Sequence, residues 1–153
     1  MARPMSFDHG HTARMASKLI FLDFDGVLHP ISAGEDGHFC RAALLASTLA
    51  GFEGNVQVVV SSDKRGYYTL DELKAMLPAE LAQHVIGVTP FRAGNRLEEI
   101  QAFVAKHAPA ADWRALDDDF LSFPKGFQQL IRCDGFVGFD DECATALRTW
   151  LTE

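Results

Sequence analysis

Two aspartates stand two positions apart directly after the most apolar run of the chain, residues 19–22. Asp23 and Asp25 can direct their carboxylates at one site only if the chain leaves extended geometry there, and the glycine after Asp25 permits such a turn. A calcium-binding EF-hand loop does not fit, because Val27 and Leu28 stand where that loop needs an oxygen ligand and a glycine. The pair is therefore a candidate acidic site at the end of a buried strand.

Hydroxyl groups and a cation follow further along the chain. Ser61 and Ser62 come directly after the apolar run 56–60, and hydroxyls with free backbone amides at a strand end suit a phosphate or another oxyanion. Arg96 stands in the first turn of a predicted helix, where a cation opposes the helix dipole by ~0.3–1 kcal/mol. A functional anion nearby would account for that placement, although turn serines and a solvated arginine give the same pattern when each is taken alone.

A third group consists of three consecutive carboxylates. Asp117, Asp118 and Asp119 come directly after the apolar run 113–116. Adjacent like charges are costly unless something neutralises them, and a hard divalent cation with oxygen ligands does so. A solvated acidic turn is the alternative, and the sequence leaves open which of the three carboxylates would bind a metal.

All of these groups except Arg96 follow short apolar runs that predict buried strands. The predicted strands are residues 19–22, 56–60, 84–88, 113–116 and 129–133. Helical spacing between and after them predicts helices over residues 41–50, 69–77, 95–107 and 140–151. Strands that alternate with helices at short connections predict an α/β fold with a parallel sheet, and sites in such sheets lie at the carboxyl ends of the strands.

The composition is that of one folded domain. The 153 residues are 48% hydrophobic and 23% charged, and we expect residues 1–17 to be a mobile leader and residues 18–153 a single domain. Fourteen Lys and Arg against 21 Asp and Glu give a net charge of −7, so a nucleic-acid partner would have to be held locally. No run approaches the ~18 apolar residues of a membrane span, and the first residues show no apolar h-region of the kind that a signal peptidase uses. We therefore expect a cytoplasmic protein without a membrane partner.

The three cysteines, Cys40, Cys133 and Cys143, show neither a CxxC motif nor a spacing typical of metal ligands. An odd number without such motifs indicates reduced thiols rather than a disulfide framework. We therefore expect free cysteines that are buried as small apolar side chains.

Taken together, the order of the acidic, hydroxyl and basic groups resembles the haloacid dehalogenase-like (HAD) superfamily of phosphohydrolases. Its members carry an apolar strand ending in DxDG, a strand ending in Ser or Thr, a Lys or Arg, and a strand ending in an acidic pair. The stretches FLDFDGVLHP, VVVSSDKR and WRALDDD further resemble small bacterial HAD-like domains related to those of RNA-repair proteins, over about residues 18–151. This resemblance implies a Rossmann-like three-layer fold with a five-stranded parallel sheet. Most members have Lys where Arg96 stands, so Lys106 and Lys125 are alternatives for the basic residue.

The resemblance also implies a role for each group. Asp23 would attack phosphorus and become an aspartyl-phosphate, while Asp25 would protonate the leaving oxygen and later take a proton from water. Magnesium would be the cofactor, because an anionic nucleophile cannot otherwise approach an anionic substrate. The metal ligands would come from Asp23, the backbone carbonyl of Asp25, and Asp117 or Asp118. The phosphate ligands would be Ser61, with Ser62 as its alternative, and Arg96.

The spacing of the motifs leaves no room for a cap domain. Positions 25 to 61 and 61 to 96 span about 35 residues each, which the predicted helices and strands already occupy. Residues 29–39 can at most form a flap over the mouth. An open site favours a phosphate on a large substrate, such as a nucleic-acid end or a phosphoprotein, or a small substrate enclosed by a second subunit. Lys64, Arg65 and Arg92 are candidates for contacts with a polyanion.

Three functions fit these motifs. The first is a magnesium-dependent phosphomonoesterase. The second is a binding or regulatory module that keeps the fold and the metal without turnover, although the intact pair Asp23 and Asp25 counts against it. The third is a phosphotransferase whose acceptor is not water.

Overall fold

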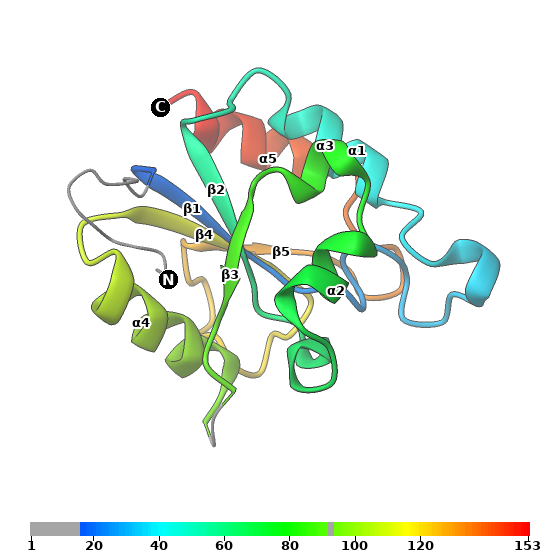
Figure 1. The fold of residues 1–153 in the computed structure, drawn as a ribbon, viewed down its shortest axis with the longest axis horizontal. Coiled ribbons are helices and arrows are strands. Elements are labelled where there is room, and N and C mark those ends of the chain that lie inside the picture. The colour runs from blue at the N-terminus through cyan, green and yellow to red at the C-terminus, as the bar shows by residue number, and fades with distance from the viewer. Residues whose placement is uncertain (1–15, 92–93) are drawn as a thin grey trace.

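A computed structural model describes residues 16–91 and 94–153, and this part of the chain forms five parallel strands in one sheet. Their order across the sheet is β3-β2-β1-β4-β5 (Figure 1). The strands are β1 Lys18–Leu22, β2 Val56–Val60, β3 Val85–Val88, β4 Asp112–Asp117 and β5 Leu130–Arg132. The predicted parallel α/β fold is therefore confirmed, and the most apolar run of the sequence is the central strand.

Five α-helices and two short 3-10 helices connect the strands in the described part of the chain. They are η1 Glu35–Gly37, α1 Ala42–Leu49, η2 Asp63–Gly66, α2 Leu70–Ala75, α3 Ala79–Ala82, α4 Arg96–His107 and α5 Asp141–Leu151. Capping boxes form at Thr69 and Asn95, each with a glutamate three residues later. Helix α3 was not predicted. It begins at Ala79, directly after Pro78 at its N-cap, where the missing N–H of proline is no loss.

The helices cover the two faces of the sheet unequally. Helices α1, α3 and α5 gather on one side of the sheet, with α2 beside α3, and α4 lies on the other side (Figure 1). Alternate residues of β1 point to the two faces, so Ile20 packs in the core beneath α1 and α5, whereas Phe21 packs beneath α4. Residues 19–22 are all fully buried, as expected for a central strand covered on both faces.

Two residues before β1 and the three cysteines show how two further predictions stand. Ala16 and Ser17, which fall in the predicted leader, hydrogen-bond to Gln57 and to the backbone of Asp112, and residues 1–15 lie outside the described part. All three cysteines are free, and Cys133 and Cys143 are buried with their sulfurs 3.7 Å apart. The prediction of burial is wrong for Cys40, which is exposed in the loop before α1, where no apolar layer covers it. None of the described helices has the length and apolarity needed to cross a membrane.

Candidate active site

The ends of three adjacent strands bring the predicted site residues together. Asp23 follows β1, Ser61 follows β2, and Asp117 is the last residue of β4. The parallel ladder continues to these positions, because the Asp23 amide donates to the Leu116 carbonyl over 3.1 Å and the Ser61 amide donates to the Leu22 carbonyl over 2.8 Å. The residues two positions earlier on each strand pack beneath α4. By strand alternation the three side chains therefore emerge at the sheet edge on the α4 face.

Three carboxylates form an acidic cluster at this edge, made of Asp23, Asp117 and Asp118. One oxygen from each lies within 4.8 Å of the others. Burial, together with the charge of Asp117, raises the pKa of Asp23 well above its ordinary range, and burial raises the pKa of Asp117 to about 6. A set of convergent carboxylate oxygens is the donor set that a hard divalent cation such as Mg²⁺ prefers. The acidic cluster therefore fits a divalent metal ion.

Arg96 is the cation that faces the acidic cluster. Its Nη1 lies 3.0 Å from Asp117 Oδ2 and 3.3 Å from Asp23 Oδ1, and its Nη2 lies 3.2 Å from Asp63 Oδ1. Burial by itself would lower the pKa of Arg96, but these carboxylates raise it, so the guanidinium stays charged. The acidic neighbours explain why a cation stands at the first turn of α4. Lys106 is exposed ten residues later on the same helix, roughly 15 Å along its axis.

Two glycines allow Asp118 to reach the cluster. Gly26 adopts φ +83°, a left-handed conformation, and a Cβ on either Gly26 or Gly135 would overlap the Asp118 carboxylate. Asp119 does not join the acidic cluster. Its carboxylate accepts hydrogen bonds from the Ser122 amide and hydroxyl. Although burial opposes the shift, these bonds lower the pKa of Asp119. The third member of the acidic triplet thus stabilises a turn.

The two serines differ in their hydrogen bonding. The Ser62 hydroxyl accepts a hydrogen bond from the Lys64 amide over 3.2 Å and so caps η2. The Ser61 hydroxyl is fully buried and has no hydrogen-bond partner among the described residues. A buried hydroxyl without a partner is costly, and a bound oxyanion would satisfy it. Of the two serines, Ser61 is the one with a hydroxyl free to bind a phosphoryl oxygen.

The arrangement of these groups matches the pattern expected for the superfamily. Asp23 stands at the end of one strand, forms an acidic cluster with the carboxylates at the end of β4, and faces an arginine. The chain matches a family described as the HAD domain in Swiss Army Knife RNA repair proteins over residues 19–144. It belongs to this HAD family. A search of curated proteins and a search of solved structures each returned no match. The family match covers the described sheet except Lys18, and it covers every residue predicted for the site.

The HAD domain has a buried ion pair beside Ser61, and the sequence did not reveal this pair. Arg65 Nη1 donates to the carbonyls of Ser61 and Ser62 over 3.1 and 2.7 Å, and its Nε donates to the Thr89 carbonyl over 3.1 Å. Its Nη2 lies 2.6 Å from Glu99 Oε1, and both side chains are buried. The prediction that Arg65 contacts a polyanion is therefore wrong, because its donors already bind the loops after β2 and β3 and helix α4.

The other basic residues near the mouth are less constrained. Lys64 is partly exposed beside η2, and Arg92 lies outside the described residues. Lys125, an alternative for the basic motif residue, is exposed and borders a cavity beside Phe120 and Phe127 rather than the acidic cluster. Arg96 is thus the one of the three basic candidates that contacts the carboxylates.

The Asp25 carboxylate is not a member of the acidic cluster. Its side chain is 55% exposed, and its Oδ1 lies 2.8 Å from Nε2 of His29, which is buried. The turn between them is closed by a hydrogen bond from the Gly26 amide to the His29 carbonyl. Sequence reasoning placed His29 only in the flap, because a single histidine after a strand carries no distinguishing signal.

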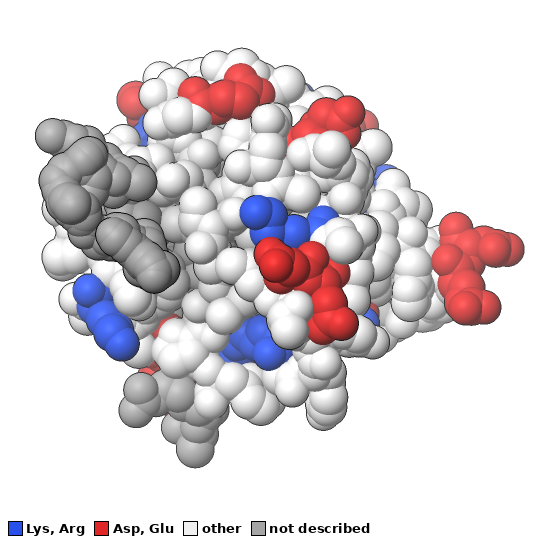
Figure 2. Space-filling view, in the orientation of Figure 1, with Lys and Arg blue, Asp and Glu red and all other residues white. Residues whose placement is uncertain are grey.

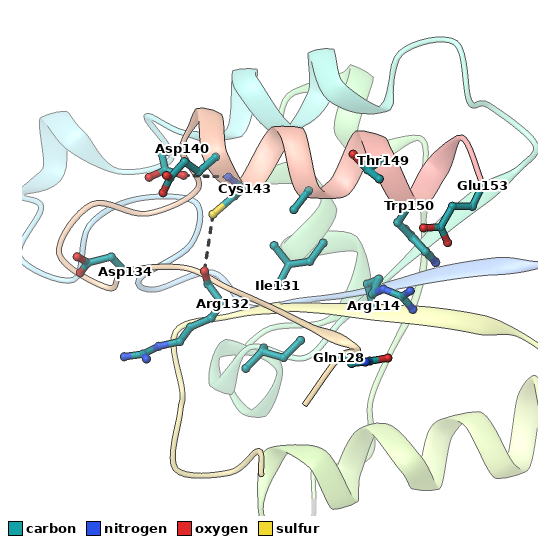
Figure 3. Close-up of a pocket in the computed structure, with 13 residues that line it drawn as sticks. Arg114, Gln128, Ile131, Arg132, Asp134, Asp140, Cys143, Thr149, Trp150 and Glu153 are labelled. Atoms are coloured by element: carbon teal, nitrogen blue, oxygen red, sulfur yellow. Dashed lines mark hydrogen bonds between the residues drawn. The ribbon is translucent and has the colours of Figure 1, made fainter. Parts of the chain in front are cut away.

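No cap covers the acidic cluster in residues 16–91 and 94–153. The segment between Asp25 and Ser61 holds η1, α1 and β2, and the segment between Ser61 and Arg96 holds η2, α2, α3 and β3. A cavity of about 500 Å³ lies elsewhere, between β5 and α5 (Figure 3). It is lined by groups of both signs such as Arg132 and Asp140, and none of the site residues lines it. The candidate active site is therefore the open edge of the sheet rather than this cavity.

Proposed function

We propose that this HAD domain is a magnesium-dependent phosphomonoesterase that acts through an aspartyl-phosphate on Asp23. The observation that carries the proposal is the position of Asp23 at the end of the central strand, inside the acidic cluster and 3.3 Å from Arg96. The partnerless Ser61 hydroxyl at the end of the next strand supports it. The family match supports phosphohydrolase chemistry in general.

Two displacements make up the proposed reaction. An Asp23 oxygen attacks phosphorus, and the bond from phosphorus to the substrate oxygen breaks while Asp25 gives its proton to that leaving oxygen. Water then attacks the same phosphorus, Asp25 takes back a proton from the water, and the Asp23–phosphate bond breaks. Inorganic phosphate leaves and both aspartates return to their starting states.

The acidic cluster would hold the metal ion, with the Asp25 carbonyl as a further ligand. When bound, Mg²⁺ supplies positive charge that stabilises the developing charge on the phosphoryl oxygens. Arg96 balances the remaining carboxylate charge and binds a phosphoryl oxygen, and the Ser61 hydroxyl binds another. Because the raised pKa of Asp23 favours its neutral form in the metal-free protein, ionisation of the nucleophile depends on cations at the cluster.

The surface around the site favours a phosphate at the end of a nucleic acid. All the large hydrophobic side chains that are exposed in the described residues lie on loops that follow the carboxyl ends of the strands. They are Ile31, Tyr67, Tyr68, Phe91, Phe120, Leu121 and Phe136. Aromatic rings at such positions can stack on unpaired bases, and the Arg132 guanidinium already lies 4.7 Å from the centre of the Phe120 ring. The description of the matched family as part of RNA repair proteins supports the same substrate class.

The flap is a poor surface for a polyanion. Residues between β1 and α1 protrude at the right of Figure 1, and Figure 2 shows acidic side chains at the end of that protrusion. Glu35 and Asp36 of η1 are exposed there. A nucleic-acid end would therefore lie over the apolar loops around the acidic cluster and away from the flap.

The test is a screen of phosphate release with p-nitrophenyl phosphate, a mononucleotide, a phosphopeptide, and 3′- and 5′-phosphorylated oligonucleotides, with Mg²⁺ or with a chelator. We expect Mg²⁺-dependent release from p-nitrophenyl phosphate and the highest kcat/KM with an oligonucleotide. Asp36→Asn is the matched control for substitutions at the site, because Asp36 is exposed on the flap. Full activity in the chelator would refute the metal requirement, and preference of a monomeric protein for the mononucleotide would refute the open site. Metal binding without turnover would identify a silent binding module.

A further inference from the structure

We propose that His29 is a positioning residue that orients Asp25 and leaves Oδ2 as the oxygen that carries the catalytic proton. The proposal rests on the proposed phosphomonoesterase function. The side-chain hydrogen bonds of His29 in the described part of the chain go to Asp25 and to the Phe39 amide, and none goes to the acidic cluster or to Ser61. His29 therefore acts through Asp25.

The hydrogen bonds of the ring fix its tautomer. His29 is 1% exposed, and its Nδ1 accepts a hydrogen bond from the Phe39 amide over 3.2 Å. A ring nitrogen that accepts from an amide carries no proton, so the ring is neutral with its proton on Nε2. Nε2 therefore donates to Asp25 Oδ1 over 2.8 Å. A neutral donor in this position holds the carboxylate without supplying a competing acid.

The surroundings hold the ring in place. His38 stacks on it with ring centres 4.5 Å apart and planes 13° from parallel, and the Phe39 ring lies at 89° to it with ring centres 5.3 Å apart. Phe39 has φ +61°, a left-handed conformation that is strained for a bulky residue and persists where the surrounding structure demands it. Here that conformation belongs to the residue whose amide binds Nδ1. The flap thus serves to fix His29.

Asp25 needs such an anchor because its side chain is largely in solvent. The bond from His29 is the one hydrogen bond that the described residues make to the Asp25 carboxylate. Oδ1 is occupied by this donor, so a proton on Asp25 resides on Oδ2. In the first displacement Oδ2–H gives its proton to the leaving oxygen, and in the second Oδ2 accepts one from water. His29 keeps its own proton throughout.

Leaving-group dependence tests this role. p-Nitrophenolate leaves without a proton, whereas an alkoxide such as that of glycerol 2-phosphate needs one, so a misplaced Asp25 harms the second substrate more. We expect His29→Leu to lower kcat/KM on glycerol 2-phosphate by ~10–100-fold more than on p-nitrophenyl phosphate, within the 10²–10⁴-fold range of general acid catalysis. The ratio kcat/KM is compared because it reports the first displacement, which is the step that differs between the two substrates. His29→Gln, whose amide can donate to Oδ1, should recover most of the loss. His107→Leu is the matched control, because this exposed histidine at the end of α4 packs on Phe103 and not on His29 or Asp25.

Each result decides the proposal. Equal losses on both substrates, no loss, or failure of His29→Gln to restore the difference would overturn it. Absence of wild-type turnover on every phosphate would instead refute the proposed function. Long-range ¹H–¹⁵N NMR of the folded wild type then tests the hydrogen-bonded tautomer without turnover: we expect protonated Nε2 and unprotonated Nδ1, and the opposite tautomer would overturn the assignment of His29. The same spectrum applies if His29→Leu fails to fold.

Discussion

Asp117→Asn should stabilise the metal-free protein at neutral pH even though it removes an ion pair. Asp117 is fully buried, and its pKa of about 6 compares with an ordinary value of 3.8. Keeping it charged above pH 6 therefore costs on the order of 3 kcal/mol relative to the unfolded chain. The asparagine oxygen can still accept from the Asp119 amide, but its NH₂ faces Arg96, which offsets part of the gain. We expect a net gain of about 1–3 kcal/mol in the free energy of unfolding.

The sign of the pH dependence follows from the raised pKa. Between pH 3.8 and about 6, Asp117 is protonated in the folded wild type but ionised in the unfolded chain. The free energy of unfolding therefore falls as the pH rises through this window. Near pH 4 the wild type and Asp117→Asn should have similar stability. The difference should grow to its full size above pH 6. Groups whose pKa is lowered, such as Asp119 and Asp140, lose their contribution at lower pH and are common to both proteins.

Urea unfolding in a chelator at a series of pH values measures this difference, and thermal unfolding should show a Tm higher by about 2–10 °C at pH 7.5. Added Mg²⁺ should stabilise the wild type, because it binds only the folded state, and should stabilise Asp117→Asn much less. Asp36→Asn, an exposed aspartate, should match the wild type throughout. An Asp117→Asn protein that is less stable than the wild type in chelator at pH 7.5 would refute the reasoning.

Three further outcomes follow from the same geometry. Gly26→Ala should lose the stabilisation by Mg²⁺, because its Cβ would overlap the Asp118 carboxylate. Gly51→Ala is its control: Gly51 has φ +91° and open space around it, so this variant should lose only ~1–2 kcal/mol in the free energy of unfolding and keep its response to Mg²⁺. Equal Mg²⁺ responses of the two variants in thermal unfolding would contradict this. Arg65→Ala should cost ~3–5 kcal/mol in urea unfolding because it leaves Glu99 buried without this partner, and a loss under ~1 kcal/mol would contradict the pairing. Ca²⁺ should raise Tm as Mg²⁺ does yet support little phosphate release, since it tolerates looser coordination; equal rates would contradict that.

The elements with strong local signals were predictable from the sequence. The run at 19–22 is continuous and apolar because β1 is covered on both faces, and the capping residues Thr69 and Asn95 fix where α2 and α4 begin. Asp23, Ser61 and Asp117 lie at one edge of the sheet because each stands at the carboxyl end of a parallel strand, and the strand pattern of the sequence is enough to predict that placement. The order of the strands, in contrast, depends on packing over the whole sheet.

Residues whose role depends on a contact between loops could not be predicted. The spacing of the sequence puts Leu97, Ile100, Val104 and His107 on one stripe of α4. The buried residues of that helix are instead Glu99, Ile100 and Phe103, and Leu97 and Val104 are half-buried at the border of the core. The stripe is rotated because Arg65, brought in from the loop after β2, neutralises Glu99. No pattern of spacing reveals such a partner.

The central claim is that Asp23 carries the phosphoryl group during the reaction. The most direct test is to quench the Mg²⁺-dependent reaction rapidly in acid and to analyse the peptide containing residues 18–25 by mass spectrometry. We predict a phosphorylated Asp23 in the wild type during turnover, and none in Asp23→Asn, whose kcat should fall by at least ~10³-fold while its fold is kept. Turnover of the wild type without any phosphorylated Asp23, together with an Asp23→Asn protein that hydrolyses p-nitrophenyl phosphate at the wild-type rate, would contradict the account.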